Sequence, residues 1–233
     1  MIKPYKKSFD YSYTLGFYPT IELIKRRKDL LRCVYVSSSA LNSDGYRKIV
    51  DLIGSPKIII SDNTISKLSD KGNDHVIGVF TKIEGKLEAS QDHVVLVNPS
   101  DMGNLGNIMR SMLAFGYSDL AIVCPAADEF NPKTIRASMG SFFALRIEKF
   151  DSFEQYLSIY ERPYIPFMLQ ANKGLKQLTF FNEPVALVFG NEATGLPLKL
   201  LNEEAVKIEQ SPDVDSLNLT TAVAIALYEA RNA

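Results

Sequence analysis

The stretch Asn98-Pro-Ser-Asp-Met-Gly-Asn-Leu-Gly-Asn-Ile-Met-Arg110 decides the fold class. A run of apolar residues at 94–97 comes directly before it and predicts a buried strand, and residues 105–115 predict a helix that begins inside it. A strand, a turn and a helix in this order are typical of an α/β fold, in which ligands bind at the carboxyl ends of the strands. The turn is therefore the first candidate site.

Three residues of this stretch have chemical significance. Gly103 and Gly106 have no side chain and let a ligand approach the backbone closely. Arg110 lies one turn into the helix, where a guanidinium group can hold a phosphate through two hydrogen bonds. The spacing matches neither G-x-G-x-x-G nor G-x-x-x-x-G-K-S/T, which disfavours the dinucleotide and P-loop motifs.

Two further segments are candidates for ligand contacts. Phe189-Gly-Asn-Glu-Ala-Thr-Gly-Leu196 follows an apolar strand, and its glycines suit a loop whose backbone meets a ligand. Ser216-Leu-Asn218 opens a final helix predicted at 217–230, with Asp215 or Ser216 as its N-cap. Taken singly, each segment is explained as well by an ordinary turn or by a plain helix cap.

Apolar patterns along the chain predict two α/β units separated by a linker. Residues 81–91 are polar without an apolar period, so we expect a small domain at 1–80, the linker at 81–91 and a second domain at 92–233. Continuous apolar strands in the second domain predict a parallel sheet covered by helices. Three other helices are predicted. One lies at 20–31 with Thr20 as its cap, one at 44–53 is closed by Gly54, and one, capped by Ser61 or Asp62, runs toward Leu68. The other predicted strands lie at 33–36, 57–60, 76–80, 120–123 and 185–189.

The composition narrows the class of protein. Hydrophobic residues make up 46% and charged residues 23% of the 233 residues, as in an ordinary globular protein. The two cysteines, Cys33 and Cys124, and the two histidines, His75 and His93, have no metal-ligand spacing, so no metal site is expected. No apolar run predicts a signal peptide or a membrane span, so we expect a cytoplasmic protein without a membrane partner.

Positive charge is concentrated near the N-terminus. The net charge is −1, but residues 1–33 hold eight Lys and Arg against three Asp and Glu, a balance of +5 that leaves −6 for the remainder. Such an asymmetry indicates a local anion-binding patch. A solvated helix face explains the same pattern equally well.

Together, and in this order, the segments resemble the SpoU (TrmH) family of RNA ribose methyltransferases, within the SPOUT class. The resemblance spans residues 94–231, and 11–80 more loosely resemble the small ribosomal-protein-type α/β domain that often precedes the family's catalytic domain. The matching motifs are Asn98, Gly103-Asn-Leu-Gly106 with Arg110, Ala114-Phe-Gly116, Lys133-Thr-Ile-Arg-Ala-Ser-Met-Gly140, Phe189 to Leu196, Ser216-Leu-Asn218 and Leu227-Tyr-Glu229.

This resemblance implies a fold, a reaction and partners. The fold is a SPOUT-type knotted parallel sheet, with a deep C-terminal trefoil knot, in a homodimer whose RNA site draws on both protomers. The reaction transfers a methyl group from S-adenosylmethionine to a ribose 2′-hydroxyl of tRNA or rRNA. The small domain is then expected to bind the RNA. The cations expected to contact it are Lys25, Arg26, Arg27, Lys28 and Arg32 of this domain and Arg136 of the second domain.

The resemblance also assigns site residues. The resemblance gives Arg110 the task of activating the 2′-hydroxyl, either as a general base or as an electrostatic clamp. Because a guanidinium normally stays protonated, we expect Arg110 to clamp the phosphate beside the ribose and to stabilise the developing oxyanion. Asn104, Ser216 and Asn218 are expected to orient Arg110 and the ribose, and Glu192 is expected to brace the second loop. Cofactor contacts are expected from Phe189, Gly190, Asn191, Gly195, Leu196, Ile208, Gln210, Leu217 and Asn218.

Two positions depart from the family pattern. Met102 stands where the family usually has Pro, and Ile208-Glu-Gln-Ser-Pro212 stands where the third motif usually begins Ile-Pro-Met-x-Gly, beside the adenine of the cofactor. Two other classes of function stay open. One is an RNA-binding module with a catalytically inactive domain, which the altered third motif favours; the other is a nucleotide-dependent oxidoreductase, which the missing glycine fingerprint disfavours.

Overall fold

The computed structural model describes residues 2–69, 72, 74–178 and 183–232. Its contacts divide the chain into two compact units, Met1–Ile83 with Asp128–Ala144, and Glu84–Ala127 with Leu145–Ala233. Residues 128–144, which the sequence placed in the second domain, thus pack within the first unit. Among the described residues, no helix is long and apolar enough to cross a membrane.

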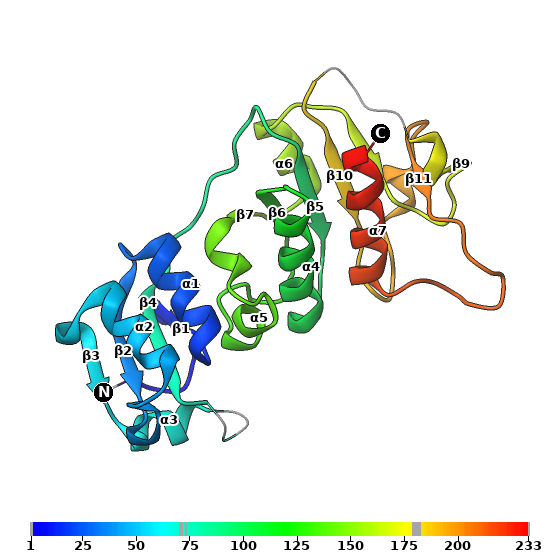
Figure 1. Ribbon diagram of the computed structural model, residues 1–233. Coiled ribbons are helices and arrows are strands. Elements are labelled where there is room, and N and C mark those ends of the chain that lie inside the picture. The colour runs from blue at the N-terminus through cyan, green and yellow to red at the C-terminus, as the bar shows by residue number, and fades with distance from the viewer. Residues whose placement is uncertain (1, 70–71, 73, 179–182, 233) are drawn as a thin grey trace. The chain divides into compact units, whose positions relative to one another are not determined.

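The first unit is a mixed four-stranded sheet with helices (Figure 1). Its strand order is β1-β4-β2-β3, in which β4 runs antiparallel to β1 and β2, and β3 runs parallel to β2. The strands are β1 (Tyr11–Tyr13), β2 (Leu31–Val36), β3 (Ile58–Ile60) and β4 (Val76–Thr81), and the helices are α1 (Phe17–Arg27), α2 (Asp44–Ile53), α3 (Asp62–Leu68) and α5 (Pro132–Ala137), with 3-10 turns at Ser38–Ala40, Ser55–Lys57 and Ser141–Ala144.

The predicted helix at 20–31 is displaced in the structure. Helix α1 begins at Phe17 and ends at Arg27, and β2 already begins at Leu31. Thr20 is not the cap, because its hydroxyl is buried inside the unit and donates to the Gly16 carbonyl. The helix at 44–53 is confirmed, and Gly54 ends it with a φ of 70°, which favours glycine.

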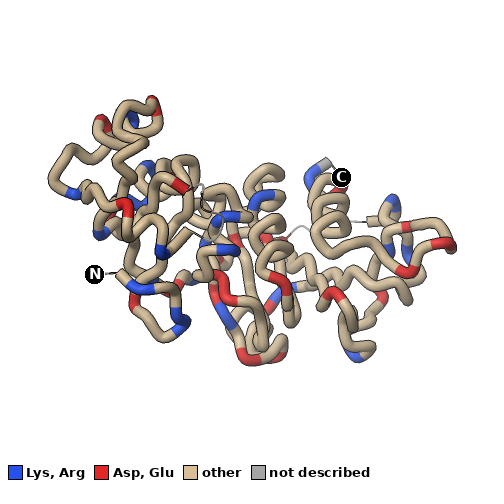
Figure 2. Tube along the Cα trace, turned by 90° about the horizontal axis from the view of Figure 1, so that it is seen from below, with Lys and Arg blue, Asp and Glu red and all other residues tan. Residues whose placement is uncertain are grey.

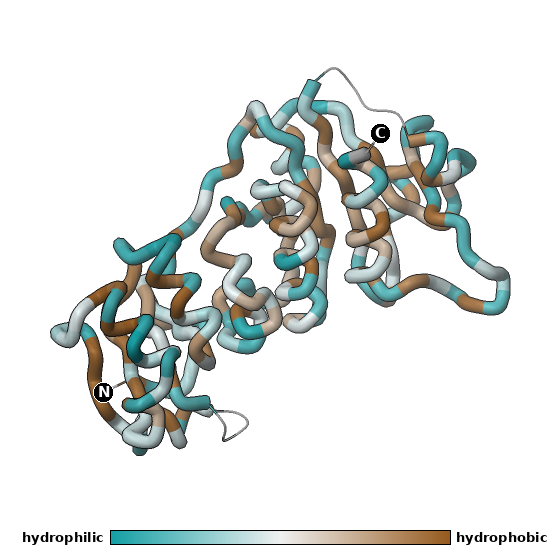
Figure 3. Tube along the Cα trace, viewed as in Figure 1, coloured by the Kyte–Doolittle hydropathy of each residue, from teal (hydrophilic) through white to brown (hydrophobic). Residues whose placement is uncertain are grey.

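The second unit contains a five-stranded sheet in which every pair is parallel, as predicted. The inner strands of this sheet are coloured mostly toward the hydrophobic end in Figure 3, as expected for strands buried on both faces, whereas the edge strand at 146–150 is only partly buried. The strands are β5 (His93–Val97), β6 (Asp119–Val123), β7 (Arg146–Phe150), β8 (Tyr164–Pro166) and β10 (Ala186–Phe189), with a separate pair β9 (Lys173–Gly174) and β11 (Val206–Lys207); the helices are α4 (Met102–Ala114), α6 (Phe153–Ile159) and α7 (Leu219–Asn232), and 3-10 turns lie at Leu175–Gln177 and Leu198–Leu200.

Strand order creates a ligand crevice in this sheet. The order is β7-β6-β5-β10-β8, so the chain leaves β5 toward β6 and β7 and returns on the other side as β8 and β10. Segments that follow β5 and β10 therefore diverge at a topological switch point, where ligands of open α/β sheets bind. Helix α7 packs against α4, which follows β5 (Figure 1).

A buried histidine holds the amino end of β5. The Nδ1 of His93 lies 2.9 Å from the Tyr156 hydroxyl, and its Nε2 lies 2.9 Å from the Glu88 carbonyl. Since a carbonyl only accepts, Nε2 carries the proton and Nδ1 accepts from the tyrosine. Burial lowers the pKa of His93 below its ordinary value, which keeps the ring neutral.

Candidate active site

The loop after β5 is shaped by an N-cap and by an unusual backbone angle. The Asp101 carboxylate accepts from the Asn104 amide at 2.7 Å and begins α4 at Met102, three residues before the predicted start. Asn98, at the end of β5, has a φ of 54°, which is rare for a residue other than glycine. The loop is therefore held in one conformation from both ends.

Glu192 joins the second loop to this first loop. One carboxylate oxygen accepts from the Ser100 amide at 3.0 Å and from its hydroxyl at 2.8 Å. The other accepts from the Asp101 amide at 3.3 Å and from the Asn104 side-chain amide at 3.2 Å. These four donors come from residues about ninety positions away in sequence and give Glu192 the bracing geometry expected of it.

The carboxylate of Glu192 is stabilised in its ionised form. Burial favours the neutral form, but the hydrogen bonds from Ser100 and Asn104 outweigh it, so the pKa of Glu192 lies below its ordinary value. At neutral pH the Glu192 side chain is therefore an ionised carboxylate that accepts hydrogen bonds from the first loop. It is not a proton donor.

The second loop returns on itself so tightly that it excludes side chains. Asn191 and Gly195 form an antiparallel bridge, and a Cβ on Gly190 would collide with the backbone of Gly195 and Leu196. Gly195 has a φ of 65°, in the left-handed region. The Asn191 side chain donates to the Asn98 carbonyl at 2.7 Å, which adds a second tie between the loops.

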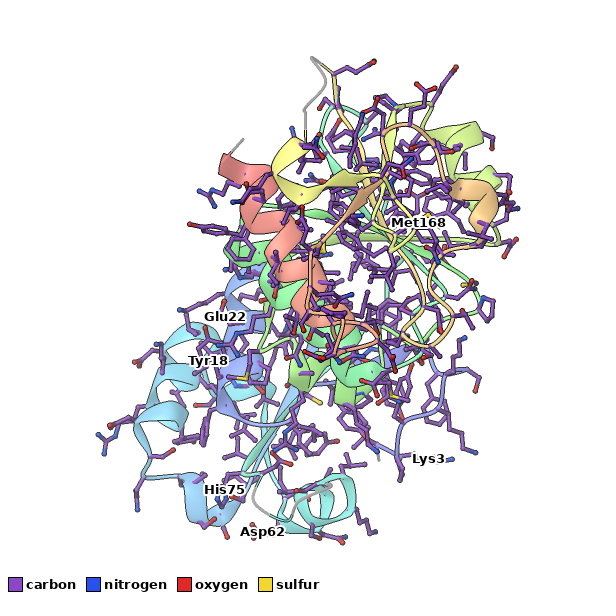
Figure 4. All side chains as sticks on the ribbon, turned by 90° about the vertical axis from the view of Figure 1, so that its right-hand side faces the viewer. Lys3, Tyr18, Glu22, Asp62, His75 and Met168 are labelled. Carbon is purple, nitrogen blue, oxygen red and sulfur yellow. The ribbon has the colours of Figure 1, made fainter. Side chains whose placement is uncertain are left out.

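A cavity of about 360 Å³ opens beside these loops. Four segments of the second unit line it: the residues after β8, the loop after β10, the chain after β11 and the start of α7. Met168, labelled in Figure 4, lies in the first of these segments. The lining residues are Phe167, Met168, Leu169, Gln170, Phe189 to Leu196, Ile208, Gln210, Asp215, Ser216, Leu217, Leu219 and Ala222.

Most of the predicted site residues meet in this cavity. Eight of the nine predicted cofactor contacts line it, together with Glu192 and Ser216. Asn218 does not line it, because its side chain caps α7 by accepting from the Thr220 amide at 2.8 Å and from the Thr220 hydroxyl. The predicted caps Asp215 and Ser216 are therefore wrong, and α7 begins at Leu219, two residues later than predicted.

The charges on the cavity wall are all negative. Glu192 and Asp215 are its ionisable residues, and no Lys, Arg or His is among the described residues that line it. Its apolar wall includes Phe189, whose ring stacks on Phe167 with centroids 4.6 Å apart and planes 10° apart. The cavity thus combines flat apolar surface with carboxylates and exposed backbone groups.

Arg110 stands apart from the cavity. It lies on the exposed face of α4, opposite the buried residues Leu105, Ile108 and Met109. Within the described part of the chain, its guanidinium has no hydrogen bond or ion pair, and it does not line the cavity. All of its donors are consequently available to a ligand from solution.

Sequence comparison identifies the family of residues 91–228, which include most of the second unit. A model described as the SpoU rRNA Methylase family matches residues 91–228, more than half of the chain. The chain belongs to this family. The match includes both loops, the chain after β11 and the start of α7, so the cavity is built from the SpoU family's region.

Two curated relatives match 59% of this chain and about half of their own length. An uncharacterized tRNA/rRNA methyltransferase of Synechocystis sp. is 34% identical over 143 residues, which are 59% of this chain and 52% of that protein. A 23S rRNA (uridine(2479)-2′-O)-methyltransferase of Streptomyces viridochromogenes is 31% identical over 59% of this chain and 51% of that protein. The matches thus span about half the length of these relatives.

A solved structure is similar over nearly the whole chain. The AdoMet-bound rRNA methyltransferase from Sinorhizobium meliloti covers 96% of this chain, with 87% of its own chain included, at 26% identity and a TM-score of 0.77. This likeness confirms the α/β fold with its mostly parallel sheet.

The cations expected to bind RNA are mostly engaged inside the first unit. Lys25 and Arg26 both face Glu22, labelled on α1 in Figure 4, at 3.8 and 2.9 Å. Basic and acidic positions are correspondingly interspersed along the chain in Figure 2. The remaining pairs are Arg27 with Asp29, Lys28 with the Leu52 carbonyl, Arg32 with Asp10, and Arg136 with the buried Asp74.

The N-terminal segment holds cations of a different kind. Lys3, Lys6 and Lys7 are exposed, and within the described residues their ammonium groups have no partner. Lys3 extends from this segment in Figure 4. Ion pairs with nearby acids weaken the positive electrostatic field of the predicted patch on α1. The field of these three lysines is not weakened by any ion pair among the described residues.

Sequence reasoning missed two contributors to the site. Ser100 supplies two of the donors to Glu192, and its only signal was its place directly after β5. Residues Phe167–Gln170 follow β8, which contains Pro166 and is only three residues long. Proline is tolerated there because β8 is the edge strand of the sheet.

Proposed function

We propose that this SpoU-family chain transfers a methyl group from S-adenosylmethionine to a ribose 2′-hydroxyl of tRNA or rRNA. The observation that carries the proposal is the cavity at the switch point. There, hydrogen bonds to Glu192 join the loop after β5 to the loop after β10. Both curated relatives have RNA methyltransferase names, and one is named for 2′-O transfer.

The residues present fit this cofactor better than a dinucleotide. S-adenosylmethionine carries a sulfonium and an ammonium, which suit a wall with the carboxylates of Glu192 and Asp215. NAD carries two phosphates, which need cations or a helix N-terminus with a glycine fingerprint. The apolar surface of Phe189, Leu196 and Ile208 suits an adenine ring.

The chain's own residues then have separate tasks. When bound, S-adenosylmethionine supplies a methyl group on a good leaving group. Arg110 presents an unengaged guanidinium, which we assign to the phosphate beside the ribose and to the developing oxyanion. Glu192 keeps the two loops together through Ser100 and Asn104, so that the reacting groups stay aligned. Ser216 lies on the cavity wall, where it can orient the ribose.

We assign RNA binding to the 1–80 domain, joined by the linker 81–91 to the catalytic domain 92–233. The assignment is supported by the start of the SpoU match at residue 91 and by the exposed lysines of the N-terminal segment. The ion pairs of α1 indicate that Lys3, Lys6 and Lys7 contribute more to RNA affinity than the cations from Lys25 to Arg32. The cytoplasmic location stays a prediction.

We further propose that the catalytic domain is knotted and dimeric. The knot would bring the loop after β10 and the start of α7 to one cavity, which both segments line. Stretching the chain from its two ends tests the knot, since a tightened knot leaves the extended length shorter than the 233 residues allow.

The proposed dimer is supported by the exposed apolar residues of α7. Val223, Ala226 and Leu227 are buried in their own unit, whereas Ile225 and Tyr228 are exposed.

Calorimetry and methylation assays test the proposed function. We expect the protein to bind S-adenosylmethionine and to transfer labelled methyl groups to tRNA or rRNA, with the product resistant to alkaline cleavage at one position because its 2′-hydroxyl is blocked. RNA binding without cofactor binding would support an inactive RNA-binding module instead. Binding of NAD in place of S-adenosylmethionine would overturn the proposal.

A further inference from the structure

Tyrosine hydroxyls hold the N-terminal segment against the sheet of the first unit. Residues 2–10 belong to no helix or strand. The Tyr11 hydroxyl nevertheless accepts from the Lys3 amide at 3.2 Å, and the Tyr13 hydroxyl accepts from the Tyr5 amide at 3.2 Å. Both of these hydroxyls come from β1. The lysines that the proposed function assigns to RNA therefore extend from a fixed backbone.

A turn in this segment brings an aromatic ring beside two of these lysines. The Phe9 amide donates to the Lys6 carbonyl at 3.0 Å, which closes the turn. The Lys82 ammonium donates to the Lys7 carbonyl at 2.9 Å and fixes the turn from β4 and its end. The side chains of Lys6 and Lys7 are exposed. The turn thus presents two ammonium groups and one ring to solvent.

The Phe9 ring is the outer member of a stack. It lies on the Tyr11 ring with centroids 5.0 Å apart and planes 19° apart, and the Arg32 guanidinium lies over the same tyrosine ring. The Asp10 carboxylate, the only acid among residues 2–11, is paired with Arg32 at 2.8 Å. Tyr11 packs against a buried apolar cluster that does not include Phe9, which stays partly exposed. The stack therefore ends in a supported ring that solvent reaches.

A supported ring beside lysines matches the chemistry of an unpaired nucleotide. Every base has a flat face that can stack on an aromatic ring, and the adjoining phosphates attract lysines. A base inside a duplex is already stacked on both faces and offers neither. An anionic membrane also attracts lysines, but it favours rings that insert into lipid, whereas the Phe9 ring is stacked on Tyr11.

We propose that Phe9 is a stacking site for an unpaired base of the RNA, with Lys6 and Lys7 at the phosphates beside that base. The inference rests on the proposed function, since it takes RNA as the ligand. Because the backbone is already fixed, binding loses little conformational freedom. Stacking does not read the edges of a base, so the site accepts any base in a single strand and discriminates against duplex.

Fluorescence anisotropy with labelled oligonucleotides tests the assignment on the full chain. The probes are an oligouridylate of about 12 nucleotides, a ribose-phosphate strand of the same length without bases, and the corresponding duplex. Phe9→Leu removes the ring, and Phe9→Tyr keeps it. The matched control is Tyr18→Leu, at an exposed ring on α1 of the same unit, labelled in Figure 4. We expect the wild type, Phe9→Tyr and Tyr18→Leu to bind the oligouridylate about tenfold more tightly than the base-free strand.

Phe9→Leu should bind the two single strands equally, and about as weakly as the wild type binds the base-free strand. A melting curve of this variant checks that it folds. Stacking itself is read from 2-aminopurine in place of one uridine, because the fluorescence of this base is quenched when it stacks. The wild type should quench it, and Phe9→Leu should not.

Three results would overturn the inference. They are equal binding of the two strands by the wild type, which needs no variant, a Phe9→Leu protein that keeps the preference, and a wild type that binds anionic phospholipid vesicles but neither strand. RNA methylation by a wild type without the preference would reject this inference and leave the proposed function standing. A wild type that shows the preference but does not bind S-adenosylmethionine would reject the proposed transfer and support the stacking site.

Discussion

Glu192 and Arg110 are both charged residues of the SpoU motifs, but the protein uses their charges in different ways. Glu192 accepts four hydrogen bonds from the first loop, so its carboxylate holds the two loops together. Arg110 has no partner among the described residues, so its charge is available to substrate. Substitutions at the two positions should therefore fail in different assays.

Arg110→Ala should abolish methylation and leave cofactor affinity nearly unchanged, because Arg110 lies outside the cavity. Removal of one preorganised donor to developing charge typically lowers the rate on the order of 10²–10³-fold. Arg110→Lys keeps the charge but loses the planar fork, so we expect it to be severely impaired as well. Single-turnover methylation and calorimetry with S-adenosylmethionine check both variants. Loss of cofactor binding would move Arg110 into the cofactor site.

Glu192→Gln should destabilise the protein and weaken cofactor binding, because the amide cannot accept from all four donors. We expect a loss of about 0.5–1.5 kcal/mol, the usual net value of a hydrogen bond, because Ser100 and Asp101 are exposed and water can replace a lost partner. Thermal melts with and without cofactor measure it. An unchanged melting temperature would mean that the two loops are held together by other contacts.

The same substitution has a predictable pH dependence. Since the pKa of Glu192 is lowered in the folded protein, its stabilising effect is fully present above the unfolded pKa of about 4.3 and is lost as the pH falls through the lower folded value. The difference in melting temperature between wild type and Glu192→Gln should thus be largest near neutral pH and shrink below about pH 4.3. A constant difference from pH 3 to pH 7 would contradict this account.

At the scale of elements, the loop after β10 depends on two glycines for different reasons. Gly190 is needed because the backbone of Gly195 and Leu196 occupies the place of a Cβ. Gly195 has open space around its Cβ position, but its φ of 65° disfavours other residues. One glycine thus permits close approach of two backbone segments, and the other permits the turn.

Gly190→Ala should open the loop and abolish cofactor binding, because rigid backbone must move to admit the methyl group. Gly195→Ala should cost only about 1 kcal/mol, the strain of a left-handed alanine, and weaken binding modestly. Cofactor titration and thermal unfolding of the two variants check the contrast. Equal losses of cofactor affinity and of thermal stability in the two variants would show that the backbone of the loop shifts at little cost to admit a Cβ at position 190.

At the scale of the whole molecule, the proposed function assigns RNA affinity to the first unit and chemistry to the second. The first unit contributes lysines without partners, and the second contributes the cavity and Arg110. Phosphate contacts release counterions, so their number can be read from the salt dependence of binding. The second unit also exposes apolar residues on α7 that suit an interface.

Replacing Lys3, Lys6 and Lys7 together by Gln should weaken RNA binding and reduce its salt dependence. Each lost contact should lower the slope of log K against log salt by about 0.7–0.9. The matched control replaces Lys25, Arg26 and Arg27 by Gln, where existing ion pairs with Glu22 and Asp29 predict a smaller effect. RNA binding that is unaffected by the first change and lost with the second would restore the helix as the main RNA surface.

Tyr228→Asp and Ile225→Asp should convert the proposed dimer into monomers, because they place charge on the exposed apolar face of α7. The control is Ile159→Asp, at another exposed isoleucine of the same unit, on α6. Light scattering at micromolar concentration measures the mass, and methylation is assayed in parallel. A fully active wild-type monomer would refute the dimer.

The sequence by itself determined the fold class and most of the cavity wall. Continuous apolar strands are typical of a parallel sheet, so β5, β6 and β10 were predictable from local residues alone. The spacing of glycines and polar residues after β5 and β10 likewise predicted the two loops. Backbone requirements of this kind are local, and a sequence pattern records them directly.

Tertiary structure alone decided which partners the polar side chains acquire. The tie from Glu192 to Ser100 joins residues 92 positions apart, and Asn218 became the cap of α7 only because the helix begins at Leu219. The cations of α1 form ion pairs with acids that lie nearby in the folded unit. Hydrogen bonds and ion pairs act over about 3–4 Å, so the fold must bring groups together before their partners are defined.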